Sequence, residues 1–174
     1  MIPDRFATQR LSVSDWRPEI ADQRLRRTLE VDLTKVLTPA VLKPLPPSMQ
    51  LEGQLEGVTA WIDARHAESD VLLVRQQQDN QLIGLMILAR SPDAMDSLTI
   101  HIGYLFAESA WGFGYATELL NGFVAACSFD QTLRLVAGVE HDNPASARVL
   151  QKTGFMLLPE QSSESTEMYF RDIV

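Results

Sequence analysis

Cysteine is nearly absent from this chain of 174 residues, which contains only Cys127. A single cysteine excludes an intrachain disulfide and fits a reducing cytoplasm. A catalytic thiol is one interpretation of Cys127, but a small buried hydrophobic residue is favoured, because free cysteine is commonly buried. Histidine is also sparse. His66, His101 and His141 are dispersed, without cysteine or carboxylate partners at ligand spacing, so no metal site is expected.

Basic residues are outnumbered by acidic residues, and the sequence has no long apolar run. The chain has 15 lysines and arginines against 23 aspartates and glutamates, a formal net charge of -8. This balance argues against a nucleic-acid partner, supports solubility and would attract a cationic acceptor. No apolar run reaches the roughly 18 residues of a membrane-spanning helix, and residues 1–5 lack the apolar core of a signal peptide. We therefore expect a cytoplasmic protein with no membrane partner, folded as a single domain over residues 1–174.

Two glycines, Gly112 and Gly114, stand between a strand predicted over residues 99–106 and a predicted helix. Glycine permits positive φ and lets the backbone approach a ligand closely, and the first N–H groups of a helix attract phosphate. The pattern lacks the Gly-Lys-Ser/Thr of a Walker loop and the third glycine of a dinucleotide fingerprint. A phosphate cradle and a simple tight turn are both compatible with it. The helix is predicted from apolar residues at helical spacing: Ala116, Leu119, Leu120, Phe123, Val124 and Cys127.

A second strand and helix follow. Residues 133–139 alternate and are rich in branched side chains, which predicts a strand. Asn143 is a suitable N-cap for a short helix that begins at Pro144, since proline fits the first helical position. Gly154 is a suitable residue to end that helix.

Together these segments resemble the GNAT superfamily of N-acetyltransferases, and within it the RimJ/RimL-like branch of ribosomal-protein N-terminal acetyltransferases. The family's loop W-G-x-G-Y-A-T-E is matched at Trp111, Gly112, Gly114, Tyr115, Ala116, Thr117 and Glu118. Its second motif, N-x-x-S … K-x-G-F, is matched at Asn143, Ser146, Lys152, Gly154 and Phe155. The T-E-R-L that opens the first strand is matched at Thr8, Arg10 and Leu11, with Gln9 in place of the glutamate. Ser109 stands where the general pattern has Gln or Arg, so one charge-assisted phosphate contact is expected to be missing.

The resemblance implies an enzyme that uses acetyl-CoA as cosubstrate, without a metal. The acetyl group would pass to a primary amine, either a protein N-terminus or a small amine, by direct attack in a ternary complex. The implied cofactor-binding residues are Tyr104, Leu105, Phe106, Trp111, Gly112, Phe113, Gly114, Tyr115, Ala116, Thr117 and Asn143. In the family, the strand before the loop splays from its neighbour, and its exposed backbone contacts the pantetheine; Leu105 is expected to contact the thioester carbonyl. An alternative is a non-catalytic acyl-CoA-binding or sensing domain, which would keep the glycine loop but would have no catalytic function at His101 and Ser146.

Two residues are the catalytic candidates. The resemblance implies that Ser146 faces the sulfur and protonates the departing thiolate; the other interpretation is a serine that satisfies a backbone donor in the first turn of its helix. His101 lies two residues before Gly103, where relatives often carry a glutamate, and histidine can accept the amine proton directly or through water. The other interpretation is a half-buried strand histidine, with Glu160, Glu164 or water as the base.

The expected fold is α+β and GNAT-like: a mixed, mostly antiparallel sheet of six to seven strands with a central splay and helices on both faces. Residues 10–13 are expected to form an edge strand, residues 19–37 one or two helices, and residues 71–75 and 82–90 two strands joined by a turn at 79–80. Ser48 is expected to cap a helix from Met49, residues 91–97 to form a loop, and residues 167–171 to form the last strand after a hairpin tip at 161–165. The acceptor pocket is expected from residues 19–47 and this hairpin.

Overall fold

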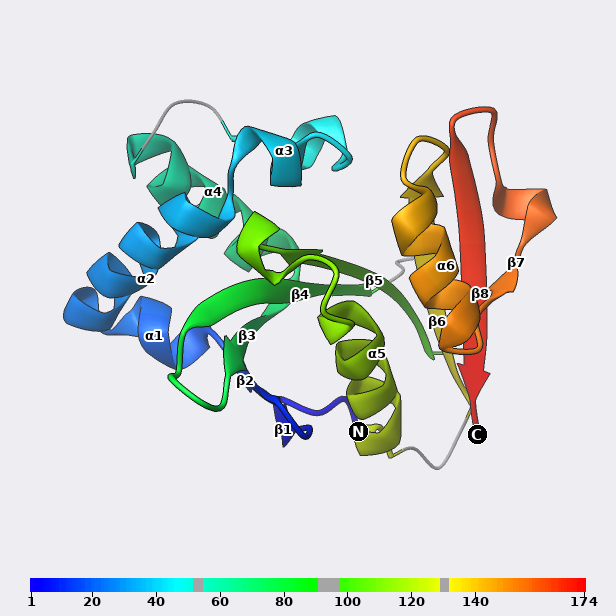
Figure 1. Cartoon of the computed structure of the whole chain (residues 1–174), viewed down its shortest axis with the longest axis horizontal. Helices are drawn as coiled ribbons and strands as arrows, with labels where there is room; N and C mark the ends of the chain where they lie inside the picture. Colours follow the sequence, from blue (N-terminus) through cyan, green and yellow to red (C-terminus); the bar gives the residue numbers. More distant parts are fainter. Residues whose placement is uncertain (52–54, 91–97, 129–131) are drawn as a thin grey trace.

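A computed structural model describes residues 1–51, 55–90, 98–128 and 132–174. They form one eight-stranded sheet, in the order β1-β2-β3-β4-β5-β6-β8-β7 (Figure 1). The β5–β6 pair is parallel and the other pairs are antiparallel, which confirms the mixed, mostly antiparallel α+β fold. The strands are β1 (Arg5–Ala7), β2 (Leu11–Asp15), β3 (Asp70–Gln76), β4 (Leu82–Arg90), β5 (Leu98–Phe106), β6 (Leu133–Glu140), β7 (Met156–Leu157) and β8 (Thr166–Ile173).

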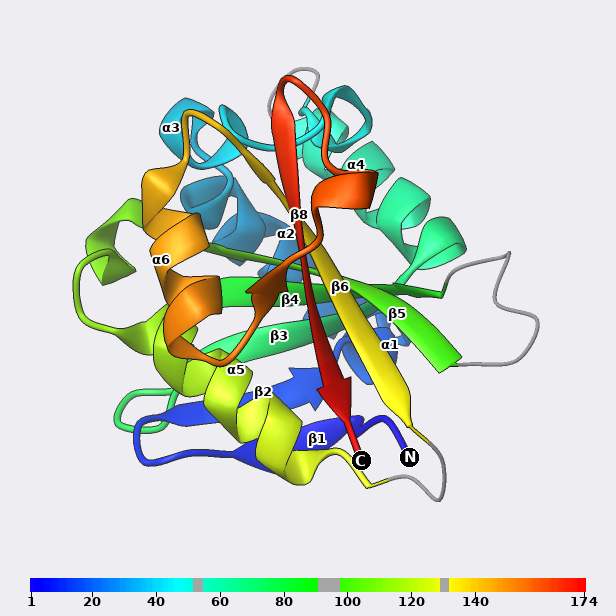
Figure 2. The ribbon, with the colours of Figure 1, turned by 90° about the vertical axis from the view of Figure 1, so that its right-hand side faces the viewer.

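Helices cover both faces of this sheet, as expected (Figures 1 and 2). On one face, α5 and α6 pack through Leu119, Phe123 and Leu150 against alternate side chains of the central strands. On the other face, α2 and α4 pack through residues such as Leu33 and Ile62. The helices are α1 (Arg17–Ala21), α2 (Gln23–Val36), α3 (Pro39–Leu42), α4 (Leu55–Glu68), α5 (Tyr115–Ala126) and α6 (Pro144–Lys152), with 3₁₀ turns η1 (Pro47–Met49), η2 (Glu108–Ala110) and η3 (Pro159–Gln161). No helix in the described ranges is both long and apolar enough to cross a membrane.

The sheet splays at its centre, between β5 and β6 (Figure 2). These strands pair from Leu98 with Leu133 to His101 with Val136, and no further pair follows. Beyond that point β5 stays with β4 as far as Phe106, and β6 stays with β8 as far as Glu140. The predicted splay is therefore confirmed, because each strand follows a different neighbour. The part of β5 beyond His101 has no β6 backbone beside it.

Three predictions of local structure were wrong or incomplete. Residues 10–13 do not form an edge strand, because β2 lies between β1 and β3. No helix begins at Met49: η1 is a single 3₁₀ turn, Gln50 is extended at φ -70° and ψ 152°, and α4 spans Leu55–Glu68. The sheet has eight strands rather than six or seven, since β1 and β7 also pair. The loop predicted over residues 91–97 lies outside the described residues.

Other local predictions were confirmed. Two helices, α1 and α2, occupy residues 17–36, and the turn between β3 and β4 is closed by a hydrogen bond from the Asn80 N–H to the Gln76 carbonyl. Asn80 adopts φ 59°, a left-handed conformation that asparagine tolerates. The Asn143 side chain accepts a hydrogen bond from the Ser146 N–H, 3.3 Å away, which makes it the N-cap of α6. Gly154 follows that helix with φ 80°.

Candidate active site

A cavity of about 550 Å³ opens where β5 leaves β6. It is bounded by the end of β5, the glycine loop, the inner side of α6 and the segment around α3. All of the predicted cofactor-binding residues line it except Phe113, whose side chain is exposed. Ser146 lines it as well. This cavity therefore brings together three segments that are far apart in sequence, around residues 105, 114 and 146.

The glycine loop has the backbone that an anion cradle needs. Gly112 and Gly114 both adopt φ 80°, and Gly114 is the N-cap of α5. A Cβ atom at Gly112 would meet nothing within 4 Å, so the backbone faces open space. The first residues of α5, Tyr115 to Thr117, line the cavity, and the first N–H groups of a helix lack intrahelical partners and carry partial positive charge. This geometry fits a phosphate or pyrophosphate group.

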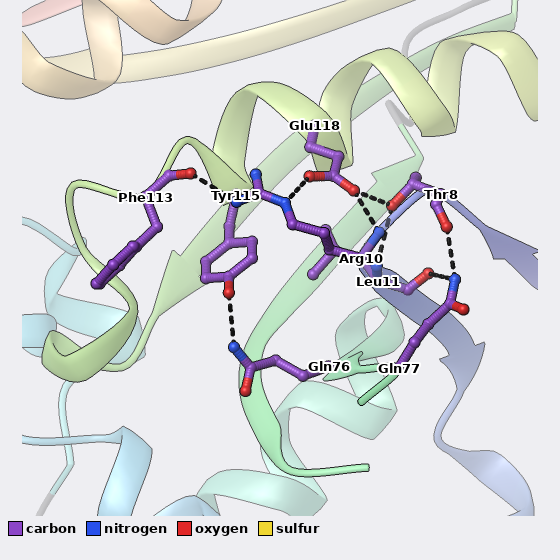
Figure 3. A network of polar contacts seen from close by, with 8 residues as sticks. All are labelled: Thr8, Arg10, Leu11, Gln76, Gln77, Phe113, Tyr115 and Glu118. Atoms are coloured by element: carbon purple, nitrogen blue, oxygen red, sulfur yellow. Dashed lines mark hydrogen bonds and ion pairs between the residues drawn. The ribbon is translucent and has the colours of Figure 1, made fainter. Parts of the chain in front are cut away.

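The N-terminal hairpin fixes this loop from outside (Figure 3). The Arg10 Nε donates to Glu118 Oε2 at 2.6 Å, and its Nη1 donates to the Phe113 carbonyl at 3.0 Å. The same guanidinium stacks over the Tyr115 ring, with 4.4 Å between Cζ and the ring centroid. Thr8 Oγ1 donates to the other Glu118 oxygen at 2.6 Å. Thr8 and Arg10, in the turn between β1 and β2, therefore hold the glycine loop and the first turn of α5 in place.

One further contact completes this anchor. Gln76 Nε2 donates to the Tyr115 hydroxyl at 2.6 Å, which attaches the loop to β3 (Figure 3). Burial raises the pKa of Glu118, but its hydrogen bonds from Thr8 and Arg10 and the arginine charge outweigh burial and leave the pKa lower than usual. Glu118 is therefore a carboxylate at neutral pH and keeps its bonds to the hairpin.

Two hydroxyl groups meet across the splay. The Tyr104 hydroxyl on β5 lies 2.8 Å from Ser146 Oγ on α6, and both residues line the cavity. Burial raises the pKa of Tyr104 to about 12, so its phenol stays protonated at neutral pH. The sequence indicated no tyrosine near Ser146, since none lies between Tyr115 and Tyr169. The contact could not be read from either motif, because it depends on where β5 leaves β6.

Two cations line the cavity that were not among the predicted cofactor-binding residues, although Lys152 matches the family motif. Arg148 and Lys152 line the cavity from α6, one helical turn apart. Ser109, at the position of the missing Gln or Arg, is exposed and does not line it. The lining of the cavity nevertheless includes two positively charged side chains. Their i, i+4 spacing places both cations on one face of α6, which is the signal that could have grouped them.

The part of the cavity lining that comes from α3 and the turn after it is apolar. It consists of Ala40, Val41, Pro44 and Leu45. Thr38 Oγ1 donates to Glu108 Oε2 at 2.5 Å, which attaches the start of α3 to the segment before the glycine loop. Residues 40–45 fall within the range predicted for the acceptor pocket. Residues 161–165, the other predicted part, do not line this cavity.

The structure does not bring the base candidates to this cavity. His101 is exposed rather than half-buried, and it shares a strand face with Gly103 and Leu105. Leu105 lies four positions further along β5, roughly 13 Å from His101. Glu160 and Glu164 are exposed and do not line the cavity either.

Cys127 is the C-cap of α5 and packs against the core on that side of the sheet. Burial raises the pKa of its thiol to about 11, so the thiol is protonated at neutral pH. A protonated, partly buried thiol is a poor nucleophile. This environment fits the hydrophobic role favoured from the sequence.

Comparison with known proteins agrees with this geometry. A family model described as an acetyltransferase (GNAT) domain matches residues 23–156. No curated protein matches the chain significantly. The structure of the ribosomal L7/L12 alpha-N-protein acetyltransferase RimL in complex with coenzyme A is similar, with a TM-score of 0.69, 21% identity, and coverage of 99% of this chain and 97% of that one.

Two other solved structures have comparable TM-scores. One is an acetyltransferase from Salmonella typhimurium that modifies the N-terminal serine of ribosomal protein L7/L12, with a TM-score of 0.65, 22% identity, and coverage of 99% and 98%. The other is spermidine N-acetyltransferase from Vibrio cholerae in complex with CoA and spermine, with a TM-score of 0.68, 12% identity, and coverage of 94% and 95%. At these identities the structures establish a shared fold. Because the family model matches most of the sequence, the chain belongs to the GNAT acetyltransferase family.

Proposed function

We propose that this protein is an acetyl-CoA-dependent N-acetyltransferase of the RimJ/RimL-like type, acting on a protein N-terminus or a small amine. The proposal rests on one observation: the same cavity is lined by the glycine loop, by the part of β5 that has no β6 partner, and by the Tyr104–Ser146 pair. A cosubstrate with phosphates at one end and a thioester at the other needs these three features in one place. The apolar end beside α3 leaves an approach for an amine.

The residues suit successive parts of acetyl-CoA. The α5 N-terminus with Arg148 and Lys152 supplies partial and full positive charge for its phosphates. The edge of β5 near Leu105 has no β6 partner, so its backbone groups are the proposed contacts of the pantetheine and the thioester carbonyl. Asn143 lines the cavity from the start of α6 and is the proposed second contact of the pantetheine.

The proposed reaction is direct attack in a ternary complex. The amine nitrogen bonds to the acetyl carbon, the carbon–sulfur bond breaks, the amine loses a proton and sulfur gains one. Ser146 is the proposed proton donor to sulfur, since it lines the cavity. Binding the amine and the thioester in one cavity makes their reaction effectively unimolecular, which lowers its entropic barrier.

Thiol release from acetyl-CoA tests the proposal. The panel pairs short peptides that differ in their N-terminal residue with polyamines and simple alkylamines. We expect coenzyme A release with at least one of these classes, together with a mass increase of the acceptor by one acetyl group. Calorimetric binding of acetyl-CoA without release for any acceptor would instead indicate a binding or sensing domain.

His101 is the proposed base, and its distance from Leu105 along β5 means that the amine proton must reach it through a chain of water molecules rather than by direct contact. Histidine changes charge between pH 5 and 8, so kcat/KM is expected to rise with pH in that range. His101→Ala is expected to remove this rise and to slow turnover by roughly 10²- to 10⁴-fold. His101→Glu is expected to recover part of the rate. Steady-state kinetics from pH 5 to 9 measure all three.

The matched control is His66→Ala, at an exposed histidine of α4 that does not line the cavity. This control is expected to keep the wild-type rate and pH profile. If His101→Ala also keeps them, His101 is not the base, and Glu160 and Glu164 are the residues to replace next.

A further inference from the structure

Tyr104 and Ser146 approach the cavity from opposite sides of the splay. Tyr104 belongs to the part of β5 that has lost its β6 partner, and Ser146 lies in the first turn of α6. Their oxygens are 2.8 Å apart, and the Tyr104 hydroxyl also lies 3.4 Å from the Ser146 carbonyl oxygen. A distance of 2.8 Å is typical of an O–H···O hydrogen bond. The phenol is thus the hydrogen-bond partner of the proposed proton donor.

The two hydroxyl groups differ in their freedom. The partly buried Tyr104 ring packs against the core cluster beneath α5 and α6, which restricts the position of its oxygen. The Ser146 backbone is held by the Asn143 cap, but a serine hydroxyl can rotate among staggered positions. A partner that occupies one lone pair of Ser146 Oγ restricts where the serine proton can point. The restricted phenol can therefore orient the mobile hydroxyl.

The role of this hydrogen bond in catalysis depends on which of the two hydroxyl groups is the donor. If the phenol donates to Ser146 Oγ, the serine proton is free to point at a group in the cavity. Because burial raises the pKa of Tyr104 to about 12, the phenol keeps its proton, and so remains a donor, across the neutral and mildly alkaline range. A tyrosine that stayed exposed would lose this property at a lower pH.

On these grounds, and resting on the proposed acetyl transfer, we propose that Tyr104 is a positioning residue for Ser146: its phenol donates to the serine oxygen and turns the serine proton toward the thioester sulfur. As the carbon–sulfur bond breaks, its electron pair goes to sulfur, which takes the serine proton and leaves as a thiol. The serine regains a proton from solvent, which receives the proton lost by the amine, so the exchange balances. Tyr104 keeps its own proton and stabilises the negative charge that develops on the serine oxygen.

Replacing the phenol by a phenyl ring tests this role. Tyr104→Phe retains the packed ring and is expected to lower kcat by roughly 10- to 100-fold, the effect of losing a hydrogen bond to a charged group. The KM for acetyl-CoA is expected to change less than about twofold, because the interaction strengthens only in the transition state. The matched control is Tyr169→Phe, a buried tyrosine on β8 that donates to Glu167 and does not line the cavity. This control is expected to retain wild-type kcat.

A double-mutant cycle separates positioning from independent catalysis. In a Ser146→Ala background, Tyr104→Phe is expected to change kcat by less than about twofold, since it no longer has a proton to orient. An equal loss in both backgrounds would overturn the inference and make Tyr104 a proton donor in its own right. Unchanged kcat for Tyr104→Phe in an active enzyme would also overturn it. A wild type inactive with every amine would overturn the proposed function, and the inference with it.

A second variant guards against a folding defect in Tyr104→Phe. Incorporation of 3,5-difluorotyrosine at position 104 keeps the hydroxyl and the shape of the ring but lowers the pKa of the phenol. The phenolate formed at alkaline pH cannot donate a hydrogen bond. We expect kcat to fall at alkaline pH in this variant and to remain level in the wild type, and identical alkaline profiles would overturn the inference.

Discussion

Gly114→Glu is expected to abolish acetyl-CoA binding while the chain stays folded. Gly114 caps α5 at φ 80°, so an added carboxylate would lie at the helix N-terminus, where it would occupy and repel the anion site. A Cβ atom there meets only Arg10 Nη2, at 3.8 Å, so no packing clash accompanies the change. The backbone strain of a non-glycine residue in this conformation costs about 1–2 kcal/mol, which a folded domain tolerates.

Calorimetric titration with acetyl-CoA, together with thermal unfolding, measures this result. Gly114→Gln is the matched control, because it adds the same length and the same strain without the charge. We expect the glutamine variant to bind acetyl-CoA more weakly than the wild type and more tightly than the glutamate variant. Wild-type affinity in a folded Gly114→Glu protein would mean that the glycine loop is only a turn.

The parts of the fold predicted from sequence are those with long periodic patterns. The strands β3 to β6 and the helices α2 and α5 each carry enough apolar positions to define a period. β1 and β7 have three and two residues, too few for a pattern of alternation, and they form because longer strands lie beside them. The edge position assigned to residues 10–13 was wrong for the same reason, since β1 covers that edge.

Prolines explain the errors between α2 and α4. Pro44, Pro46 and Pro47 are unfavourable inside a helix, and the short helix α3 just before them was not predicted. Thr38 caps that helix by accepting from the Val41 N–H at 3.4 Å, a signal present in the sequence. After the prolines, Ser48 resembled a cap, but its carbonyl accepts from Arg65 and the chain stays extended at Gln50. Local propensity was outweighed here by tertiary contacts.

The candidate site was predictable where motifs mark it and not where it depends on tertiary geometry. Gly112, Gly114 and Asn143, which the motifs mark, line one cavity. The Tyr104 hydroxyl reaches Ser146 only because β5 and β6 diverge after four paired positions, which no local pattern encodes. Strand alternation placed His101 on one face of β5, but it did not indicate how far along the strand the cavity would open.

Ser146→Ala is expected to lower kcat by roughly 10²- to 10³-fold with little change in acetyl-CoA affinity, because general acid catalysis acts on the transition state. The other interpretation of Ser146, a serine that supports its helix, makes a different prediction. The cap of α6 uses the Ser146 N–H and the Asn143 oxygen, and alanine keeps both. The hydroxyl contributes the contact with Tyr104 instead. Stability is therefore expected to change by less than about 1 kcal/mol, the net contribution of one neutral hydrogen bond.

Steady-state kinetics, calorimetry and thermal unfolding on the same preparation separate these interpretations of Ser146. Ser48→Ala, at an exposed serine of η1 that does not line the cavity, is the control and is expected to match the wild type in all three. A Ser146→Ala protein with full turnover and a lower Tm would assign the serine to helix stability. A lower kcat at unchanged Tm and affinity would leave proton donation to sulfur as its role, because the alanine variant differs from the wild type only by the oxygen that faces the cavity.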